Sequence, residues 1–357
     1  MASLGQSALS PVKIVVYLAI IGAILYFLLR GDSPPPLQKV AGFAQGTSYH
    51  ISWWSNPPVA TATIEAEFDT TLAQIDAELS TYRDDSYISK FNNSSSTDWQ
   101  AASADFIQLI ETAKEINHKT DGCYDPTIGP LFNLWGFQKD IFNLPTPEQI
   151  AQVKSEIGID KVEVNKAQLQ IRKALPQLQL NFSSMSEGYT IDKLTKVLEQ
   201  HHIQHYLVEF GGDMKIRGHK PDGSQWRIAI QRPENDATDN RTPYAVVTIN
   251  DQSGVTLDTS GTYRHHFDAD GKQYSHILDP RTGYPVSHQL VSASVFGSNP
   301  NVGDAWATAM LCLGPKAGKT IAEREQLEVF FITEDNQTFS NSRSQPLQQS
   351  TRVTFNE

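Results

Sequence analysis

A histidine, a carboxylate and a guanidinium stand close together in the C-terminal third of the sequence. His276 ends a β-rich run that we expect to pair, through the turn cluster 268–271, with the run before it. The loop 279–283 follows at once and carries Asp279 and Arg281 between Pro and Gly residues, which favour a tight turn. Such a group suits proton transfer at a phosphate. A hairpin with a polar, non-catalytic tip explains the same pattern equally well.

An Asp and a Thr one helical turn apart form a second candidate group. Asp304 and Thr308 fall within residues 299–313, where we expect a helix that ends at Gly314. Residues i and i+4 of a helix point the same way. A carboxylate and a hydroxyl suit Mg²⁺, which takes few protein ligands and completes its shell with substrate phosphates. Taken alone, such a pair more often lies on a helix surface.

The elements that must position these residues include both helices and strands. Apolar residues at helical spacing predict helices over 59–79, from an N-cap at Ser103 to 121, from a capping box at Thr146 to 158, and from a cap at Ser184 or Ser186 to 198. Scattered Pro and Gly predict an irregular loop over 122–137. Further β-rich segments predict strands over 44–54, 161–171, 178–182, 205–218, 226–231, 244–249, 254–258, 290–296, 327–333 and 338–340.

Length and composition exclude several classes of protein. The chain has 357 residues, 39% apolar and 19% charged, which is typical of a globular protein with a sizeable core. A net charge of −11 without a basic block argues against nucleic-acid binding. Cys123 and Cys312 lack zinc-ligand spacing. Two buried free thiols are the simplest interpretation, although the sequence gives no distance with which to exclude a disulfide.

The N-terminus carries a long apolar run. Residues 14–29 contain no charged side chain and, with the residues just before them, approach the length that spans a bilayer. The run exceeds most signal-peptide cores, and no A-x-A cleavage site follows. We therefore predict a signal anchor over 1–30, a Pro-rich linker over 31–43 and a folded domain over 44–357. A cleaved signal peptide is the alternative, and the flanking Lys13 and Arg30 barely specify orientation.

Several short motifs occur in an order that is itself informative. They are STYR-x-x-S at 80–86, DPT-x-GPL at 125–131, EGY-x-x-D at 187–192, GGD at 211–213, TSG-x-Y at 259–263, HI-x-DPRTG-x-P at 276–285 and DA-x-x-TA at 304–309. In this order they resemble the FAD:protein FMN transferase (ApbE) family over roughly residues 46–333.

The resemblance implies an α+β fold in which helices flank antiparallel sheets, in a two-lobed, T-fold-like domain that binds FAD between its lobes. It implies a Mg²⁺-dependent reaction that cleaves FAD, attaches FMN through a phosphoester to a threonine of a target protein, and releases AMP. The implied partners are flavin-bearing subunits of membrane redox complexes. With the predicted anchor, the implied location is the bacterial inner membrane, single-pass, with the catalytic domain on the periplasmic side.

The resemblance also implies roles for individual residues. His276 is the candidate base, because the acceptor hydroxyl is a weak nucleophile and His titrates near neutral pH. Mg²⁺ would be held by the side chains of Asp304 and Thr308 and by the backbone carbonyl of Thr190. Arg281 either neutralises phosphate or is tied to Asp279. The positions that match the family's FAD contacts are Gln45, Tyr82, Cys123, Tyr124, Asp125, Glu187, Lys193 and Leu278.

Two other functions fit the same residues. An FAD pyrophosphatase would use water in place of the threonine hydroxyl and release free FMN and AMP. A membrane-tethered flavin-binding protein would hold FAD without reaction. The presence of His276, Asp304 and Thr308 argues against the second of these functions.

Overall fold

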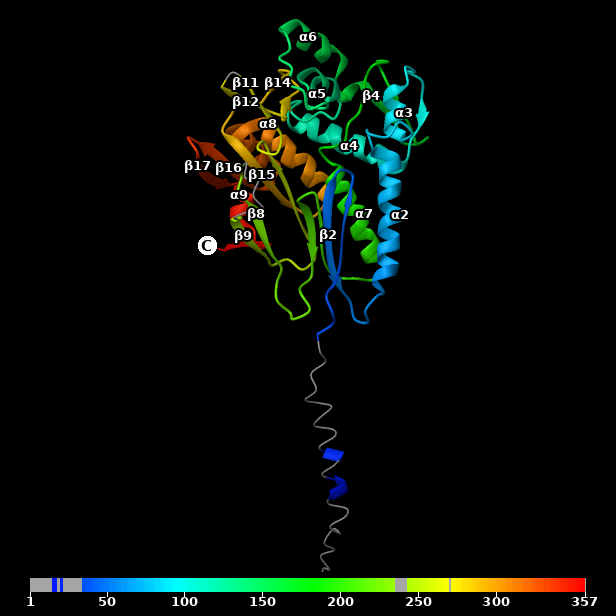
Figure 1. Cartoon of the computed structure of the whole chain (residues 1–357), viewed down its shortest axis with the longest axis vertical. Helices are drawn as coiled ribbons and strands as arrows, with labels where there is room; N and C mark the ends of the chain where they lie inside the picture. Colours follow the sequence, from blue (N-terminus) through cyan, green and yellow to red (C-terminus); the bar gives the residue numbers. More distant parts are fainter. Residues whose placement is uncertain (1–14, 18–19, 22–33, 235–242, 270, 357) are drawn as a thin grey trace, which may run out of the picture.

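The computed structural model describes residues 15–17, 20–21, 34–234, 243–269 and 271–356 (Figure 1). Most of the apolar run at 14–29 therefore lies outside the described residues. Within the described part of the chain, no helix combines the length and apolar character that crossing a bilayer requires. The membrane anchor stays a prediction.

An eight-stranded sheet forms the centre of the domain. Every pairing between its strands is antiparallel. Strand β1 lies at one edge and occupies part of the range 31–43, which the sequence suggests as a linker. The strand order is β1 (Gln38–Ala44), β2 (Thr47–Trp54), β6 (His205–Phe210), β7 (Asp213–Arg217), β10 (Val255–Gly261), β15 (Leu290–Gly297), β16 (Glu328–Asp335) and β17 (Thr338–Arg343).

The two faces of this sheet are covered differently. Helices α7 (Ser186–Gln200) and α8 (Pro300–Arg324) pack on one face, and α2 (Thr61–Leu79) lies along α7. On the other face lies a three-stranded sheet of β18 (Val353–Asn356), β9 (Pro243–Ile249) and β8 (Arg227–Gln231). Along β16, Val329 and Phe331 join the core beneath α8, while Phe330 and Ile332 join the core beneath the small sheet. This period of two is what a strand buried on both faces requires.

The remaining elements surround this centre. Helices α5 and α6 and the hairpins β11–β12 and β13–β14 gather at the end of the domain opposite the start of β1 (Figure 1). Trp135 holds this end together, because its indole nitrogen donates to the Gly283 carbonyl at 2.9 Å. The bounds are α3 (Tyr87–Asn93), β3 (Gln100–Ala101), α4 (Ala104–Lys119), α5 (Gly129–Trp135), α6 (Pro147–Glu156), η1 (Ile159–Lys161), β4 (Val162–Asn165), β5 (Gln170–Lys173), β11 (His266–Ala269), β12 (Lys272–Ser275), β13 (Leu278–Asp279), β14 (Tyr284–Pro285) and α9 (Gln345–Gln349).

Two local predictions are wrong. The range 122–137 is not wholly irregular, because α5 forms within it, with Pro130 in its first turn and Gly136 at φ 90° as its C-cap. Neither Ser184 nor Ser186 caps α7, whose N-cap is Met185 without a side-chain hydrogen bond. The predicted helix end at Gly314 is confirmed, because Gly314 leaves the helical conformation (φ 77°, ψ −179°) and a second helical stretch follows it within α8.

The predicted strand at 178–182 is also absent, for an identifiable reason. Leu178, Leu180 and Phe182 are buried, as the alternating pattern requires. The backbone of Leu180, however, is paired by a side chain: its N–H donates to Asn92 Oδ1 and its carbonyl accepts from Asn92 Nδ2, both at 2.8 Å. One amide therefore replaces a neighbouring strand.

Cys123 and Cys312 form a disulfide, so the free-thiol interpretation is wrong. Their Cα atoms lie 5.8 Å apart, within the usual range for such a bond. Cys312 lies on α8, and Cys123 lies in the loop that follows α4. The bond therefore fixes this loop against the helix that carries Asp304 and Thr308.

We expect the disulfide to contribute about 2–5 kcal/mol to the free energy of unfolding, because it closes a long loop in the unfolded chain. The double variant Cys123→Ala/Cys312→Ala should show a lower midpoint in urea than the oxidised wild type. Dithiothreitol should lower the wild-type midpoint and leave that of the variant unchanged. Equal midpoints for oxidised wild type and variant would contradict this expectation.

Candidate functional site

Two adjoining pockets bring most of the candidate residues together. Asn181 and Ser183 belong to both linings, so the two pockets are neighbours. Gln45, Tyr82 and Glu187 line the first pocket. Cys123, Tyr124, Asp125, His276, Leu278 and Thr308 line the second.

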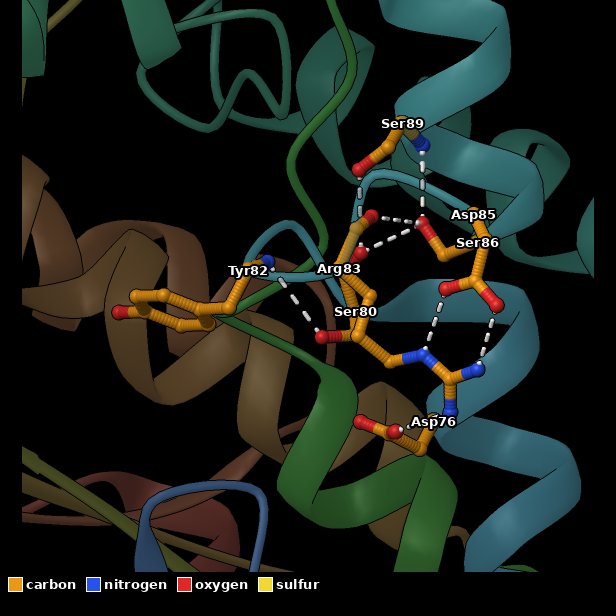
Figure 2. Close-up of polar contacts among 7 residues, drawn as sticks. All are labelled: Asp76, Ser80, Tyr82, Arg83, Asp85, Ser86 and Ser89. Carbon is orange, nitrogen blue, oxygen red and sulfur yellow. Dashed lines mark hydrogen bonds and ion pairs between the residues drawn. The ribbon is translucent and has the colours of Figure 1, made fainter.

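Tyr82 stands on a tightly bonded loop at the mouth of the first pocket. Arg83 donates to Asp76 at 2.8 Å and, with two nitrogens, to Asp85 at 2.9 and 2.8 Å. Three serines complete the network shown in Figure 2: Ser80, Ser86 and Ser89. The Tyr82 ring extends away from this network, and the residue is 92% exposed. A rigid loop that holds an exposed aromatic ring over a pocket suits stacking on a planar ligand.

His276 lies just after β12, in the wall of the second pocket. Its Nδ1 lies 2.7 Å from the His265 carbonyl oxygen. Because a carbonyl only accepts, Nδ1 carries the proton, and in the neutral ring Nε2 keeps a free lone pair. Burial, with a smaller contribution from the nearby positive charge of Arg264, lowers the pKa of His276 to about 4. The ring is therefore a neutral base at pH 7.

Four carboxylates from four elements meet beneath the pockets. Asp304 of α8 accepts from the Gly188 N–H at the start of α7, at 3.1 Å. Burial, with repulsion from Asp213, raises the pKa of Glu187 to about 8. Burial also raises the pKa of Asp213 to about 7, and burial and mutual repulsion raise those of Asp258 and Asp304. Such an excess of buried negative charge suits a divalent cation.

The residues around Asp304 fit a Mg²⁺ site. Thr308 follows Asp304 by one turn of α8, and its hydroxyl lies 3.1 Å from that of Ser260. Thr190 is buried in α7, and its hydroxyl donates to the Gln45 side-chain oxygen at 3.2 Å. Carboxylate and hydroxyl oxygens are the ligands that Mg²⁺ prefers. Among the described residues, the group of three acid, thiol or imidazole ligand atoms that lie within 4.8 Å of one another is Cys123, Asp279 and Cys312, whose two sulfurs are in the disulfide. The four carboxylates are not gathered that closely, so a cation at Asp304 would rely on hydroxyl, backbone and substrate oxygens as well.

Lys193 and Asp125 have other partners. Lys193 forms an ion pair with Asp105 at the start of α4, and it lines neither of the two pockets. Asp125 lines the second pocket, but its carboxylate accepts from Thr127 at 2.8 and 2.6 Å and from Ile159 at 3.2 Å. The ion pair therefore holds Lys193 apart from the candidates that line the pockets, and Asp125 has a part in shaping the pocket loop. Thr190 and Asp304 also lie outside both linings.

The guanidinium nearest the carboxylates is one that the sequence analysis missed. Arg281 is bound by two nitrogens to Asp279, at 2.9 and 2.8 Å, which favours the structural role. Arg264 instead donates to the Gly211 carbonyl at 3.0 Å, and its charge lowers the pKa of both Glu187 and Asp304. Its position directly after the TSG-x-Y motif was the available signal.

Gly211 is required where it stands. Its φ is +67°, and a Cβ there would overlap the Glu187 carboxylate. The two glycines of the GGD motif thus let Glu187 and Arg264 both approach the backbone between β6 and β7. The same motif contains Asp213, which the sequence analysis also left without a role.

Comparisons with known proteins identify the family of this chain. The ApbE family model matches residues 45–331. The FAD:protein FMN transferase of Escherichia coli (strain K12) is 36% identical over 332 residues, covering 90% of this chain and 93% of that protein. That of Haemophilus influenzae is 35% identical over 314 residues, covering 86% and 89%.

Solved structures agree as well. Flavin transferase ApbE from Vibrio cholerae gives a TM-score of 0.78 at 31% identity, covering 88% of this chain and 99% of that one. The apo form of the Pseudomonas stutzeri flavinyl transferase ApbE gives 0.80 at 31% identity, covering 89% and 98%. These matches confirm the predicted family resemblance and the α+β fold with antiparallel sheets and helices.

Proposed function

We propose that this chain, which belongs to the ApbE family, is an enzyme that uses Mg²⁺ to transfer FMN from FAD to a threonine of a protein acceptor, with release of AMP. Its curated relatives are FAD:protein FMN transferases. One observation carries the chemistry: a neutral histidine and the Thr308 hydroxyl line the same pocket, and Asp304 lies one helical turn from Thr308.

Different residues of the chain take part in different steps of the proposed transfer. When bound, Mg²⁺ neutralises charge that develops on the FAD pyrophosphate. His276 Nε2 accepts the proton of the acceptor hydroxyl as its oxygen bonds to the phosphorus of the FMN half. The bond from this phosphorus to the bridging oxygen of the pyrophosphate breaks, and AMP leaves with the bridging oxygen and its electron pair. Tyr82 stacks on the isoalloxazine ring, and Arg264 faces the phosphates.

For the location, we propose an inner-membrane anchor over 1–30, a linker, and the flavin transferase domain on the periplasmic side. The apolar run supports the anchor. The disulfide supports an oxidising compartment, since such bonds are rare in reducing cytosol. The proposed partners are flavin-bearing subunits of membrane redox complexes, which such an anchor would bring close.

The test incubates the full chain with FAD, Mg²⁺ and the acceptor domain of such a subunit. We expect the acceptor to gain the mass of one attached FMN, with AMP in solution. An acceptor with alanine in place of its threonine should gain nothing. Free FMN beside an unmodified acceptor would instead establish the pyrophosphatase, and intact FAD would establish a binding protein.

A further inference from the structure

Asp258 is an exceptional carboxylate for the place it occupies. It belongs to β10 and is fully buried. Among the described residues, neither of its oxygens has a hydrogen-bond partner. Burying a carboxylate without a partner is costly, because protein dipoles or a counter-charge must replace its water. The hydrogen bonds of the chain therefore do not explain why a carboxylate is buried at this position.

The position of Asp258 links it to the proposed cation site. Val255 and Leu257 of the same strand face the small sheet, so Asp258 faces the opposite side, toward α8. Its Oδ2 lies against Gly303, where any Cβ would overlap it. Asp304 directly follows Gly303 in α8. The Asp258 carboxylate therefore lies beside the residue that precedes Asp304.

The charges around Asp258 are of one sign. Burial raises the pKa of Asp258 well above its usual range, and the nearby carboxylates of Asp213, Asp304 and Glu187 raise it further. The Thr256 hydroxyl offsets only part of this effect. Of Asp258, Asp304 and Thr308, only Thr308 lines the second pocket, and both carboxylates lie behind its wall.

We propose that Asp258 is a positioning residue of the divalent-cation site, whose buried charge behind Asp304 raises the affinity for the ion without contacting it. This inference rests on the proposed Mg²⁺ site at Asp304. Carboxylates behind the ligands of a metal commonly set its affinity in this way. The cation in turn relieves the repulsion that Asp258 suffers from Asp213 and Asp304.

Asp258→Asn tests the proposal, because it keeps the shape of the side chain and removes its charge. We expect isothermal titration of the full chain with Mg²⁺, and electron paramagnetic resonance with Mn²⁺, to show about tenfold weaker binding. The metal-free variant should unfold at a higher temperature than the metal-free wild type, because a buried repulsion is gone. The two effects have opposite signs, which a general loss of folding cannot produce.

Asp251→Asn is the matched control, since it makes the same chemical change at a carboxylate that pairs with Arg352. Its metal affinity should stay at the wild-type value. Asp258→Ala gives a second charge-removing variant and should weaken binding as the asparagine does. Wild-type metal affinity in either Asp258 variant would overturn the proposal. If the wild type binds neither Mg²⁺ nor Mn²⁺, the metal site itself is overturned. This outcome is distinct from failure of the Asp258 proposal, because it is seen in the wild type alone.

Discussion

Replacing His276 with alanine is expected to lower the rate of FMN transfer by about two to four orders of magnitude and to leave FAD affinity near the wild-type value. The imidazole accepts a proton from the incoming hydroxyl, a step that ligand binding alone does not need. The rate is measured from the mass of the acceptor in a single turnover, and the affinity from quenching of flavin fluorescence.

The pH profile of the wild type sharpens this prediction. Because burial lowers the pKa of His276 to about 4, the ring is already deprotonated across the neutral range. At saturating Mg²⁺, the step that depends on His276 should therefore decline only as the pH falls toward that pKa. His276→Gln, which does not titrate, should lose this acid limb along with the activity. Wild-type rates in His276→Ala would remove the residue from the mechanism.

Asp304→Ala is expected to abolish both transfer and the response to Mg²⁺. In the wild type, Mg²⁺ at a hundredfold excess over its dissociation constant should stabilise the fold by about 2.7 kcal/mol, because the ion binds only the folded chain. The variant should gain nothing from the same addition. Thermal unfolding with and without Mg²⁺ measures this difference, beside the acceptor assay.

Two further variants distinguish the loss of a metal ligand from the loss of packing around Asp304. Asp304→Asn retains an oxygen that accepts from the Gly188 N–H, so it should fold as the wild type does and still lose most of the Mg²⁺ response. Asp251→Asn removes the charge of a carboxylate that pairs with Arg352. This variant should keep both the transfer activity and the response to Mg²⁺. Full activity in both Asp304 variants would refute the metal assignment.

Local signals were enough for several elements. The Ser103 cap and the capping box at Thr146 are both present, because each depends only on residues within one turn. The break at Gly211 and Gly212 also falls where it was expected, between β6 and β7. These features need no knowledge of the rest of the fold.

Contacts between distant residues were not readable from the sequence. The amide of Asn92 replaces a strand partner for a residue 88 positions away. Asp258 carries no motif, and only its burial against Gly303 reveals it. Lys193 shows a different limit. Lys193 follows Glu187 by six residues, which rotates its side chain by about 120° around the helix axis. The side chain of Lys193 therefore reaches Asp105, away from the side that Glu187 and Thr190 share.

The bond between Cys123 and Cys312 closes a covalent ring between two residues that are 189 positions apart in sequence. Any single cut by a protease inside that ring leaves one particle, whose two pieces part only after reduction. The loop that carries Cys123 and the helix that carries Cys312, which both line the second pocket, would thereby stay joined after a nick.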